Sequence, residues 1–166
     1  MEQEILNQLY RQYSREIYLY LYSFCKNKEL AEDLMQDTFL KALLSLKDQH
    51  TNMRAWLYMV ARNLYFNEQK RQKRKDSYQK QIQDTFIEEN VLEGILASEQ
   101  KRHLYEMLME LDEKKREILI LQYYSELSQK EIAAILHMSP ENVRVLAYRG
   151  KRDLKKYLEE SNYEIS

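Results

Sequence analysis

Apolar residues recur every three or four positions through the first 75 residues, which is the spacing of one helix face. This pattern predicts a helix from about Glu2 to Phe24, a second from about Glu29 to Leu46 and a third from about Met53 to Lys75. A break near the middle of the third would give four helices. The alternation from Tyr18 to Tyr22 is typical of a strand, but no turn residue isolates it, so helix is the better interpretation.

The second predicted helix has two contrasting faces. The face that we expect in the core carries Ala31, Met35, Phe39, Ala42 and Leu46. The opposite face is polar and carries Asp33, Gln36, Asp37 and Lys41. This division indicates that the apolar side chains of the helix are committed to the core.

The third predicted helix combines an apolar stripe with a basic and aromatic outer strip. The stripe contains Leu57, Val60, Ala61 and Leu64, with Trp56 on its flank, where core packing is the expected role. The outer strip contains Asn63, Phe66, Asn67, Lys70 and Arg74. Asparagine is disfavoured inside helices because its side chain competes for backbone hydrogen bonds. Two asparagines one turn apart, beside an aromatic ring and cations, indicate a surface that reads base edges or unstacked bases.

The helical pattern weakens after Lys75. Polar residues dominate from Asp76 to about Glu89, which indicates a linker. Helical spacing returns from about Val91 to Leu111, and another helix is predicted from its N-cap, Asp112, to Ser125. We expect these two helices to pack with the segment that follows them into a second small bundle.

That following segment contains two helix start signals in close succession. Ser128 is a plausible N-cap, and Glu131 three residues later completes a capping box. Ser139 and Pro140 repeat the signal, with proline at the first helical position. Between them lies one apolar face, made of Ile132, Ala133, Ile135 and Leu136. Two helices joined by a turn of about three residues predict a helix-turn-helix, whose second helix enters the DNA major groove.

The second of these helices also has two different faces. The inward face contains Val143, Ala147, Gly150 and Leu154, with Leu146 at its edge. The outward face contains Glu141, Arg144, Val145, Tyr148, Arg149 and Arg152. A row of arginines around a tyrosine favours contacts with base edges and phosphates. An ordinary helical hairpin with a charged, solvated face is the alternative.

Composition favours an all-α protein. Two glycines and one proline in 166 residues, of which 32% are charged, leave little turn punctuation for sheets. We expect two small helical bundles joined by a flexible linker: residues 1–75, a linker over 76–100, and residues 101–166 with the helix-turn-helix. Cys25, the single cysteine, is expected to be a small core residue and fits a reducing cytoplasm. With no apolar run near the ~20 residues that span a bilayer and no signal sequence, we expect a soluble, cytoplasmic protein.

The net charge of −1 conceals two opposite blocks. Residues 51–80 hold eight basic residues against two acidic ones, a local charge of +6. Residues 81–112 hold two basic residues against eight acidic ones, a local charge of −6. This distribution indicates basic surfaces for nucleic acid and an acidic segment that stays away from them.

Four short motifs, taken together, resemble one family. They are Ala31–Phe39 (AEDLMQDTF), Arg54–Asn63 (RAWLYMVARN), Lys115–Leu119 (KREIL) and Glu131–Ala133 (EIA). In this order and at this spacing the chain resembles the extracytoplasmic-function sigma factors of bacterial RNA polymerase. The resemblance covers nearly the whole chain apart from the linker.

The resemblance implies three functional surfaces. A surface that docks on the coiled coil of the largest polymerase subunit would include Asp33, Gln36, Asp37 and Lys41. The surface for the minus-ten element would include Asn63, Phe66, Asn67, Lys70 and Arg74, and the Lys47–Asn52 loop that captures a flipped base would contribute Asp48, Gln49, His50, Thr51 and Asn52. The surface that reads the minus-thirty-five element would include Lys130, Glu141, Asn142, Arg144, Val145, Tyr148, Arg149 and Lys151.

The sequence departs from the family pattern at four positions. The family usually has arginine where Gln122 and Leu146 stand, so phosphate anchoring would fall more on Lys130, Arg149 and Lys151. Histidine at His137 replaces a turn glycine, and it tolerates a left-handed conformation better than most residues do. Val145 replaces a frequent serine, and its apolar side chain suits contact with a thymine methyl.

The resemblance also implies the partners. These are core RNA polymerase, through its largest-subunit coiled coil and its flap, promoter DNA, and an anti-sigma factor, with no direct membrane insertion. We expect no cofactor, no metal and no catalytic residue, because such a protein supplies binding energy rather than chemistry. Family members are commonly held by a membrane-associated anti-sigma factor.

Two other classes compete with this interpretation. A conventional helix-turn-helix regulator with a helical sensor or partner-binding domain would bind a palindromic site as a dimer, and it leaves the Asn63 and Asn67 strip unexplained. A helical enzyme with a carboxylate-bridged metal site needs Glu-x-x-His pairs on facing helices. The three histidines, His50, His103 and His137, supply no such pair.

Overall fold

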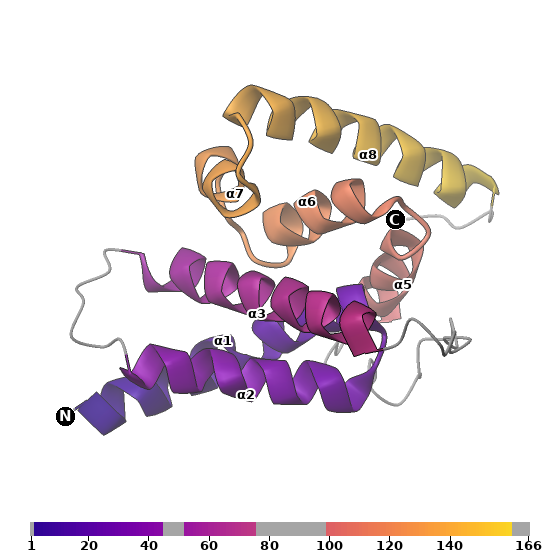
Figure 1. Ribbon diagram of the computed structural model, residues 1–166. Coiled ribbons are helices and arrows are strands. Elements are labelled where there is room, and N and C mark those ends of the chain that lie inside the picture. Colours follow the sequence, from indigo (N-terminus) through magenta and orange to yellow (C-terminus); the bar gives the residue numbers. More distant parts are fainter. Residues whose placement is uncertain (1, 45–51, 76–98, 161–166) are drawn as a thin grey trace. The chain divides into compact units, whose positions relative to one another are not determined.

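A computed structural model describes residues 2–44, 52–75 and 99–160 of the chain. These residues form helices and connecting turns, and the described ranges contain no strand (Figure 1). The chain divides into two compact units, between Phe86 and Ile87. The all-α, two-bundle prediction is therefore confirmed.

The N-terminal unit contains three helices: α1 (Glu2–Cys25), α2 (Lys28–Leu44) and α3 (Met53–Lys75). Each of them packs on the other two. The predicted helices are confirmed, but α3 is continuous and has no break near its middle. The end predicted for the second helix, Leu46, lies outside the described residues.

Tyrosines fill much of the core of the N-terminal unit. Tyr20 is fully buried, and its ring meets that of Tyr58 edge to face, with centroids 5.0 Å apart. Tyr65 is also buried, and its hydroxyl donates a hydrogen bond to the Phe24 carbonyl at 3.4 Å. Large rings bury much apolar area while the hydroxyl still finds a partner. The strand-like alternation at Tyr18–Tyr22 is therefore a buried helical segment.

The inward face of α3 differs in part from the predicted stripe. Leu57 and Ala61 are fully buried as expected, but Val60 and Leu64 are only half-buried. Tyr58 and Tyr65 are buried instead, so the helix is rotated toward its tyrosines. The predicted stripe was partly wrong because α1 presents an aromatic surface, which gives the tyrosines of α3 more area to bury than the aliphatic residues.

An ion pair ties α1 to the start of α3. The Arg54 guanidinium donates two hydrogen bonds to the Glu16 carboxylate, from Nε to Oε1 at 2.7 Å and from Nη2 to Oε2 at 3.0 Å. The Tyr58 hydroxyl adds a third hydrogen bond to Oε1 at 3.1 Å. Burial opposes the charge of the guanidinium, but the bonds and attraction to Glu16 outweigh it and raise the pKa of Arg54. A paired, bidentate contact of this kind fixes both distance and orientation.

The C-terminal unit contains four described helices: α5 (Glu99–Leu108), α6 (Glu113–Tyr123), α7 (Gln129–Leu136) and α8 (Pro140–Glu160). The predicted N-caps at Asp112, Ser128 and Ser139 are confirmed by their hydrogen bonds to the backbone three residues later. The helix predicted to run to Leu111 ends earlier, at Leu108, because residues 109 and 110 form a turn and residue 111 forms a bend. Its expected start at Val91 lies outside the described residues.

Close packing of α6 on α8 supports the helix-turn-helix. A Cβ at Gly150 would lie 3.1 Å from Leu119 Cδ1, so the two helices approach more closely than most side chains permit. The Lys115 ammonium donates to Asp153 at 2.7 Å across the same contact. The outward face of α8 is thereby held in a fixed orientation relative to the rest of this unit.

Candidate nucleic-acid and protein interfaces

The polar half of the outer face of α2 is formed as predicted. Asp33, Gln36, Asp37 and Lys41 are all exposed. Ala31, Met35, Phe39 and Ala42 are buried, together with Leu34 and Thr38. The two faces of this helix therefore separate cleanly over its first three turns, and the carboxylates of Asp33 and Asp37 lie on one side, one turn apart.

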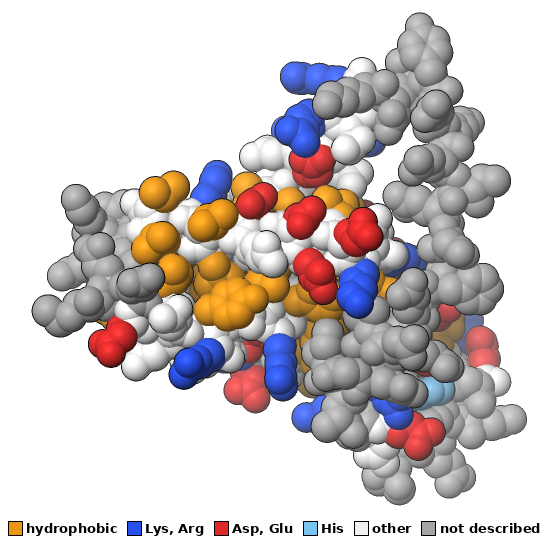
Figure 2. Space-filling view, turned by 90° about the horizontal axis from the view of Figure 1, so that it is seen from below, with side chains coloured by type: hydrophobic (Ala, Val, Ile, Leu, Met, Phe, Trp, Pro, Cys, Tyr) orange, Lys and Arg blue, Asp and Glu red, His pale blue; other side chains and the backbone are white. Residues whose placement is uncertain are grey.

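The apolar half of this outer face was not predicted. Leu40, Leu43 and Leu44 are 57%, 38% and 83% exposed, so the expectation that all apolar residues of α2 are committed to the core was wrong. On the helix wheel they continue the face of Asp33, Gln36 and Asp37 toward the C-terminal end. Figure 2 shows hydrophobic side chains gathered beside acidic ones on this side of the protein. The helix carries more leucines than one stripe can bury, which is the sequence signal for this surface.

The outer strip of α3 exposes four of its five predicted residues: Asn63, Asn67, Lys70 and Arg74. Phe66, the fifth, is half-buried, so its assignment to the exposed strip was wrong. Its ring lies 5.5 Å from the Phe24 ring and 4.6 Å below the Arg62 guanidinium. Phe66 therefore supports the strip from beneath, because neighbouring aromatic rings offer it more contact than solvent does.

Most of the predicted base-capture loop lies outside the described residues. The loop residues concerned are Asp48, Gln49, His50 and Thr51. Asn52 is described and exposed. Its side-chain oxygen accepts a hydrogen bond from the Ala55 backbone N–H at 3.1 Å. Asn52 therefore caps the N-terminus of α3 and fixes where the loop joins that helix.

The turn between α7 and α8 has the geometry of a helix-turn-helix. His137 adopts a left-handed conformation, with φ 56° and ψ 48°, and thereby fills the role that glycine usually has at a helix C-terminus. Four predicted residues on the outer face of α8 are exposed: Glu141, Arg144, Tyr148 and Arg149. Val145 is only half-buried, so its side chain reaches the edge of that face. Arg144 Nη2 donates to Glu141 Oε1 at 2.6 Å.

Three further predicted residues lie in different surroundings. Lys130 and Asn142 are exposed in the first turns of α7 and α8, and the Asn142 N–H donates to Ser139 Oγ at 3.1 Å. Lys151 is exposed too, but its ammonium lies 5.4 Å above the Tyr123 ring. In this conformation Lys151 points along the side of α8 rather than outward from its arginine row.

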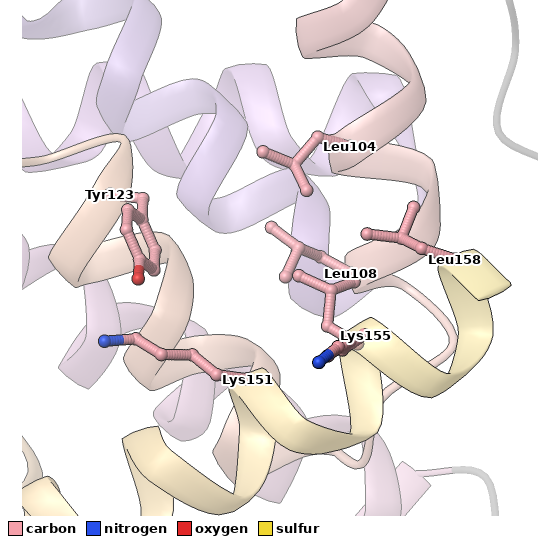
Figure 3. Close-up of a pocket in the computed structure, with 7 residues that line it drawn as sticks. Leu104, Leu108, Tyr123, Lys151, Lys155 and Leu158 are labelled. Atoms are coloured by element: carbon pink, nitrogen blue, oxygen red, sulfur yellow. The ribbon is translucent and has the colours of Figure 1, made fainter. Parts of the chain in front are cut away.

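An apolar groove of about 220 Å³ lies between α5, the end of α6 and the C-terminal half of α8. Its lining consists of Leu104, Leu108, Tyr123, Lys151, Leu154, Lys155 and Leu158. In Figure 3 the leucine side chains converge on the groove, and the two lysines extend along α8. No sequence pattern indicated this groove, because its walls come from three separate helices.

The single cysteine, possible metal ligands and possible membrane spans were also considered as functional features. Burial raises the pKa of the Cys25 thiol, which donates to the Asn27 carbonyl at 3.3 Å, so the thiol stays protonated in the core. Within the described ranges, no three His, Cys, Asp or Glu side chains are grouped closely enough to hold a metal ion. None of the described helices is both long and apolar enough to span a bilayer.

Comparison with known proteins bears on both units. Residues 9–75 match the Sigma-70 region 2 family, and residues 101–154 match Sigma-70, region 4. The chain is 34% identical over 173 residues to the RNA polymerase sigma factor YlaC of Bacillus subtilis (strain 168), covering 96% of this chain and 95% of the relative. It is 30% identical over 151 residues to the ECF RNA polymerase sigma factor SigM of the same strain, covering 90% and 93%.

Among solved structures, the chain is similar in fold to the sigma factor RpoE, crystallised with the anti-sigma factor NepR from Bartonella quintana. The TM-score is 0.76 at 24% identity, over 92% of this chain and 96% of that one. The two matched regions account for the three-helix unit and the helix-turn-helix unit respectively. The protein belongs to the extracytoplasmic-function sigma factors of bacterial RNA polymerase.

Proposed function

We propose that this sigma factor binds core RNA polymerase through α2, opens promoter DNA with the outer strip of α3 and reads the upstream promoter element with α8. The observation that carries the proposal is the exposed strip of Asn63, Asn67, Lys70 and Arg74, which lies within the match to Sigma-70 region 2. It is supported by a second, separate nucleic-acid surface on α8. The protein acts in the cytoplasm and performs no chemistry of its own.

Polymerase docking is assigned to the whole outer face of α2. The carboxylates of Asp33 and Asp37 would steer the encounter with a basic surface, since complementary charge mainly raises association rates. Leu40 and Leu44 would then supply apolar area, because exposed leucines grouped beside charges are typical of protein contact sites. Core polymerase would bury both halves of the face.

Strand opening is assigned to α3. Lys70 and Arg74 would hold duplex phosphates, and this contribution weakens as salt rises because it depends on counterion release. Asn63 and Asn67 would accept the unstacked bases of the non-template strand through hydrogen bonds to their edges. Unstacking a base costs a few kcal/mol, which the protein contacts must offset. The aromatic support under the strip, from Phe66 and Phe24, keeps the asparagines in place while the bases exchange partners.

Two further contacts are assigned to the C-terminal unit and to a regulator. The groove beside α8 would accept the polymerase flap, since its apolar floor is accessible and its two lysines suit a partial negative charge. An anti-sigma factor would hold the protein inactive by covering the surfaces that polymerase uses. A conventional helix-turn-helix regulator would need neither the α2 face nor the asparagine strip, so the sigma-factor function accounts for more of the exposed surface.

Transcription of fragmented genomic DNA tests the function. Core polymerase is incubated with the fragments in the presence and absence of the protein, and the 5′ ends of the transcripts are mapped. We expect a new, limited set of start sites, each preceded by the same two short sequence elements. A start-site map identical to that of core polymerase alone would contradict the proposed function.

A further inference from the structure

Over residues 140–152, the outer face of α8 contains one acidic side chain, Glu141, among its arginines. Glu141 lies at the second position of the helix, and Arg144 Nη2 donates to its carboxylate at 2.6 Å. Both side chains remain open to solvent, with 74% and 61% of their surface exposed. Among the residues that the structure describes, Arg144 is the only arginine on the outer face of α8 with a carboxylate within ion-pair distance.

A carboxylate on a DNA-facing surface works against phosphate binding, because it repels the backbone. A carboxylate contributes favourably to DNA recognition only where it accepts a hydrogen bond from a base. In the major groove the usual donor to a glutamate is the cytosine amino group. Glu141 stands where a recognition helix meets base edges, since the N-terminal residues of that helix reach deepest into the groove.

The ion pair leaves enough hydrogen-bonding capacity for both partners to contact a base pair. A guanidinium has five N–H donors, so Arg144 retains four after its bond to Glu141. A carboxylate accepts several bonds, so Glu141 also retains free lone pairs. Side by side, the two side chains present a row of donors followed by an acceptor.

A G·C pair presents the complementary row. Its major-groove edge carries guanine N7 and O6 as acceptors, followed by the cytosine N4 amino group as donor. An A·T pair presents an acceptor, a donor and an acceptor, which the Arg144–Glu141 row does not match. Reversal to C·G places the donor at the wrong end of the row.

We propose that Glu141 and Arg144 act as one unit that reads a single G·C base pair in the upstream promoter element, with Arg144 on guanine and Glu141 on the cytosine amino group. This rests on the proposed function of α8. Glu141 is thus a specificity-determining residue that lowers general affinity for DNA and raises discrimination. A carboxylate in the first turn also interacts favourably with the helix dipole, but that interaction does not depend on which base pair is bound.

Selection from a promoter library tests the proposal. Core polymerase carrying the full-length protein selects DNA that is randomised over the upstream element, and the bound fraction is sequenced. The parent protein is compared with Glu141→Ala, Glu141→Gln and Arg144→Ala. Glu159→Ala is the matched control, because it removes the same charge from an exposed position at the far end of α8.

We expect the parent to prefer G·C over A·T at one position by about tenfold or more, the range of a good bidentate contact. Glu141→Ala and Arg144→Ala should each reduce the preference at that same position at least fivefold and leave the other positions unchanged. Glu141→Gln should retain part of it, since its amide oxygen still accepts. Glu159→Ala should leave it intact. Replacing the selected guanine with 7-deazaguanine should weaken binding by the parent and not by Arg144→Ala.

Two results would overturn the proposal in different ways. If Glu141→Ala keeps the full G·C preference while Arg144→Ala loses it, Glu141 forms only a solvent-exposed ion pair with Arg144 and does not read the cytosine. If the parent protein selects no upstream sequence at all, the proposed function of α8 fails, and the role of Glu141 fails with it.

Discussion

Glu16 accepts three hydrogen bonds from α3, and its side chain retains only 19% of its surface exposed. The first two come from Arg54 and the third from Tyr58. Hydrogen bonds to charged groups contribute more than neutral ones, and a half-buried guanidinium that loses its partner is poorly solvated. Glu16 therefore holds the start of the helix that we assign to strand opening.

Glu16→Gln is expected to lower the free energy of unfolding of the N-terminal unit by about 1.5–3 kcal/mol, the usual range for a hydrogen bond to a charged group. Urea denaturation followed by circular dichroism measures this change. Glu68→Gln is the matched control, because it breaks a pair with the exposed Arg71 within one helix and should cost less than about 0.5 kcal/mol. Equal effects of the two substitutions would show that the Glu16 contact adds nothing special.

His137 adopts an unfavourable, left-handed backbone conformation at the turn of the helix-turn-helix. A non-glycine residue with φ near 56° is disfavoured by about 1 kcal/mol relative to glycine, and the His137 side chain is exposed and buries little in return. His137→Gly should therefore raise the stability of the C-terminal unit by about 0.5–1 kcal/mol. Ala134→Gly, at an exposed helical position nearby, should lower it by a similar amount. Thermal unfolding of both variants checks the opposite signs.

Helix ends were predictable from the sequence, whereas several exposed residues were not. Ser128 and Ser139 each accept a hydrogen bond from the backbone N–H three positions later, at Glu131 and Asn142, so local sequence contains the whole interaction. The exposure of Phe66 and Leu40, in contrast, depends on which neighbouring side chains or helices cover them. The Phe24 and Tyr65 rings draw Phe66 inward, and the narrow contact face of α2 leaves Leu40 outside. A helical wheel gives the relative direction of side chains but not the width of the surface that a neighbouring helix covers.

The contact between α6 and α8 should respond to pH. The hydrogen bond from Lys115 lowers the pKa of Asp153 below its ordinary 3.8, so its contribution is present above about pH 4 and is lost as pH falls through the folded-state value. The bond to Asp153 raises the pKa of Lys115 above 10.5, so that contribution is present below about pH 10 and lost as pH rises further.

Asp153→Asn should consequently destabilise the C-terminal unit at neutral pH and have little effect near pH 2. Denaturation midpoints of the parent and the variant, measured from pH 2 to pH 8, should converge in acid. A difference that stays constant over this range would mean that the Lys115–Asp153 pair does not contribute through its charges.

The outer face of α2 makes a prediction about assembly. Gln36→Ala with Asp37→Ala should weaken binding to core polymerase about tenfold, equivalent to about 1.4 kcal/mol, and leave the helical circular dichroism signal unchanged. Leu40→Ser with Leu44→Ser should weaken it as well, since exposed apolar area would be lost from the contact. Glu99→Ala with Gln100→Ala removes comparable exposed side chains from α5 and should leave binding intact. Full binding by the Gln36 and Asp37 double variant would contradict the docking assignment.

The protein consists of two helical units, each with its own core and each with an exposed face that we assign to nucleic acid. The first unit combines the asparagine strip with the helix that we assign to polymerase docking, and the second carries a helix-turn-helix. Recognition of duplex DNA and capture of unstacked bases place different demands on side chains. Because the two units have separate cores, the side chains for duplex recognition and those for binding unstacked bases do not have to be supported by the same core.

Permanganate probing shows whether the outer strip of α3 opens promoter DNA. Core polymerase with the parent protein is incubated on linear promoter DNA, and thymines near the start site are probed with permanganate. We expect reactive thymines with the parent and none with core polymerase alone. The double variant Asn63→Ala, Asn67→Ala should show strongly reduced reactivity, although it should still bind core polymerase and still protect the upstream element. A pre-melted bubble should restore part of its activity. Equal opening by the double variant and the parent would contradict the assignment of strand opening to α3.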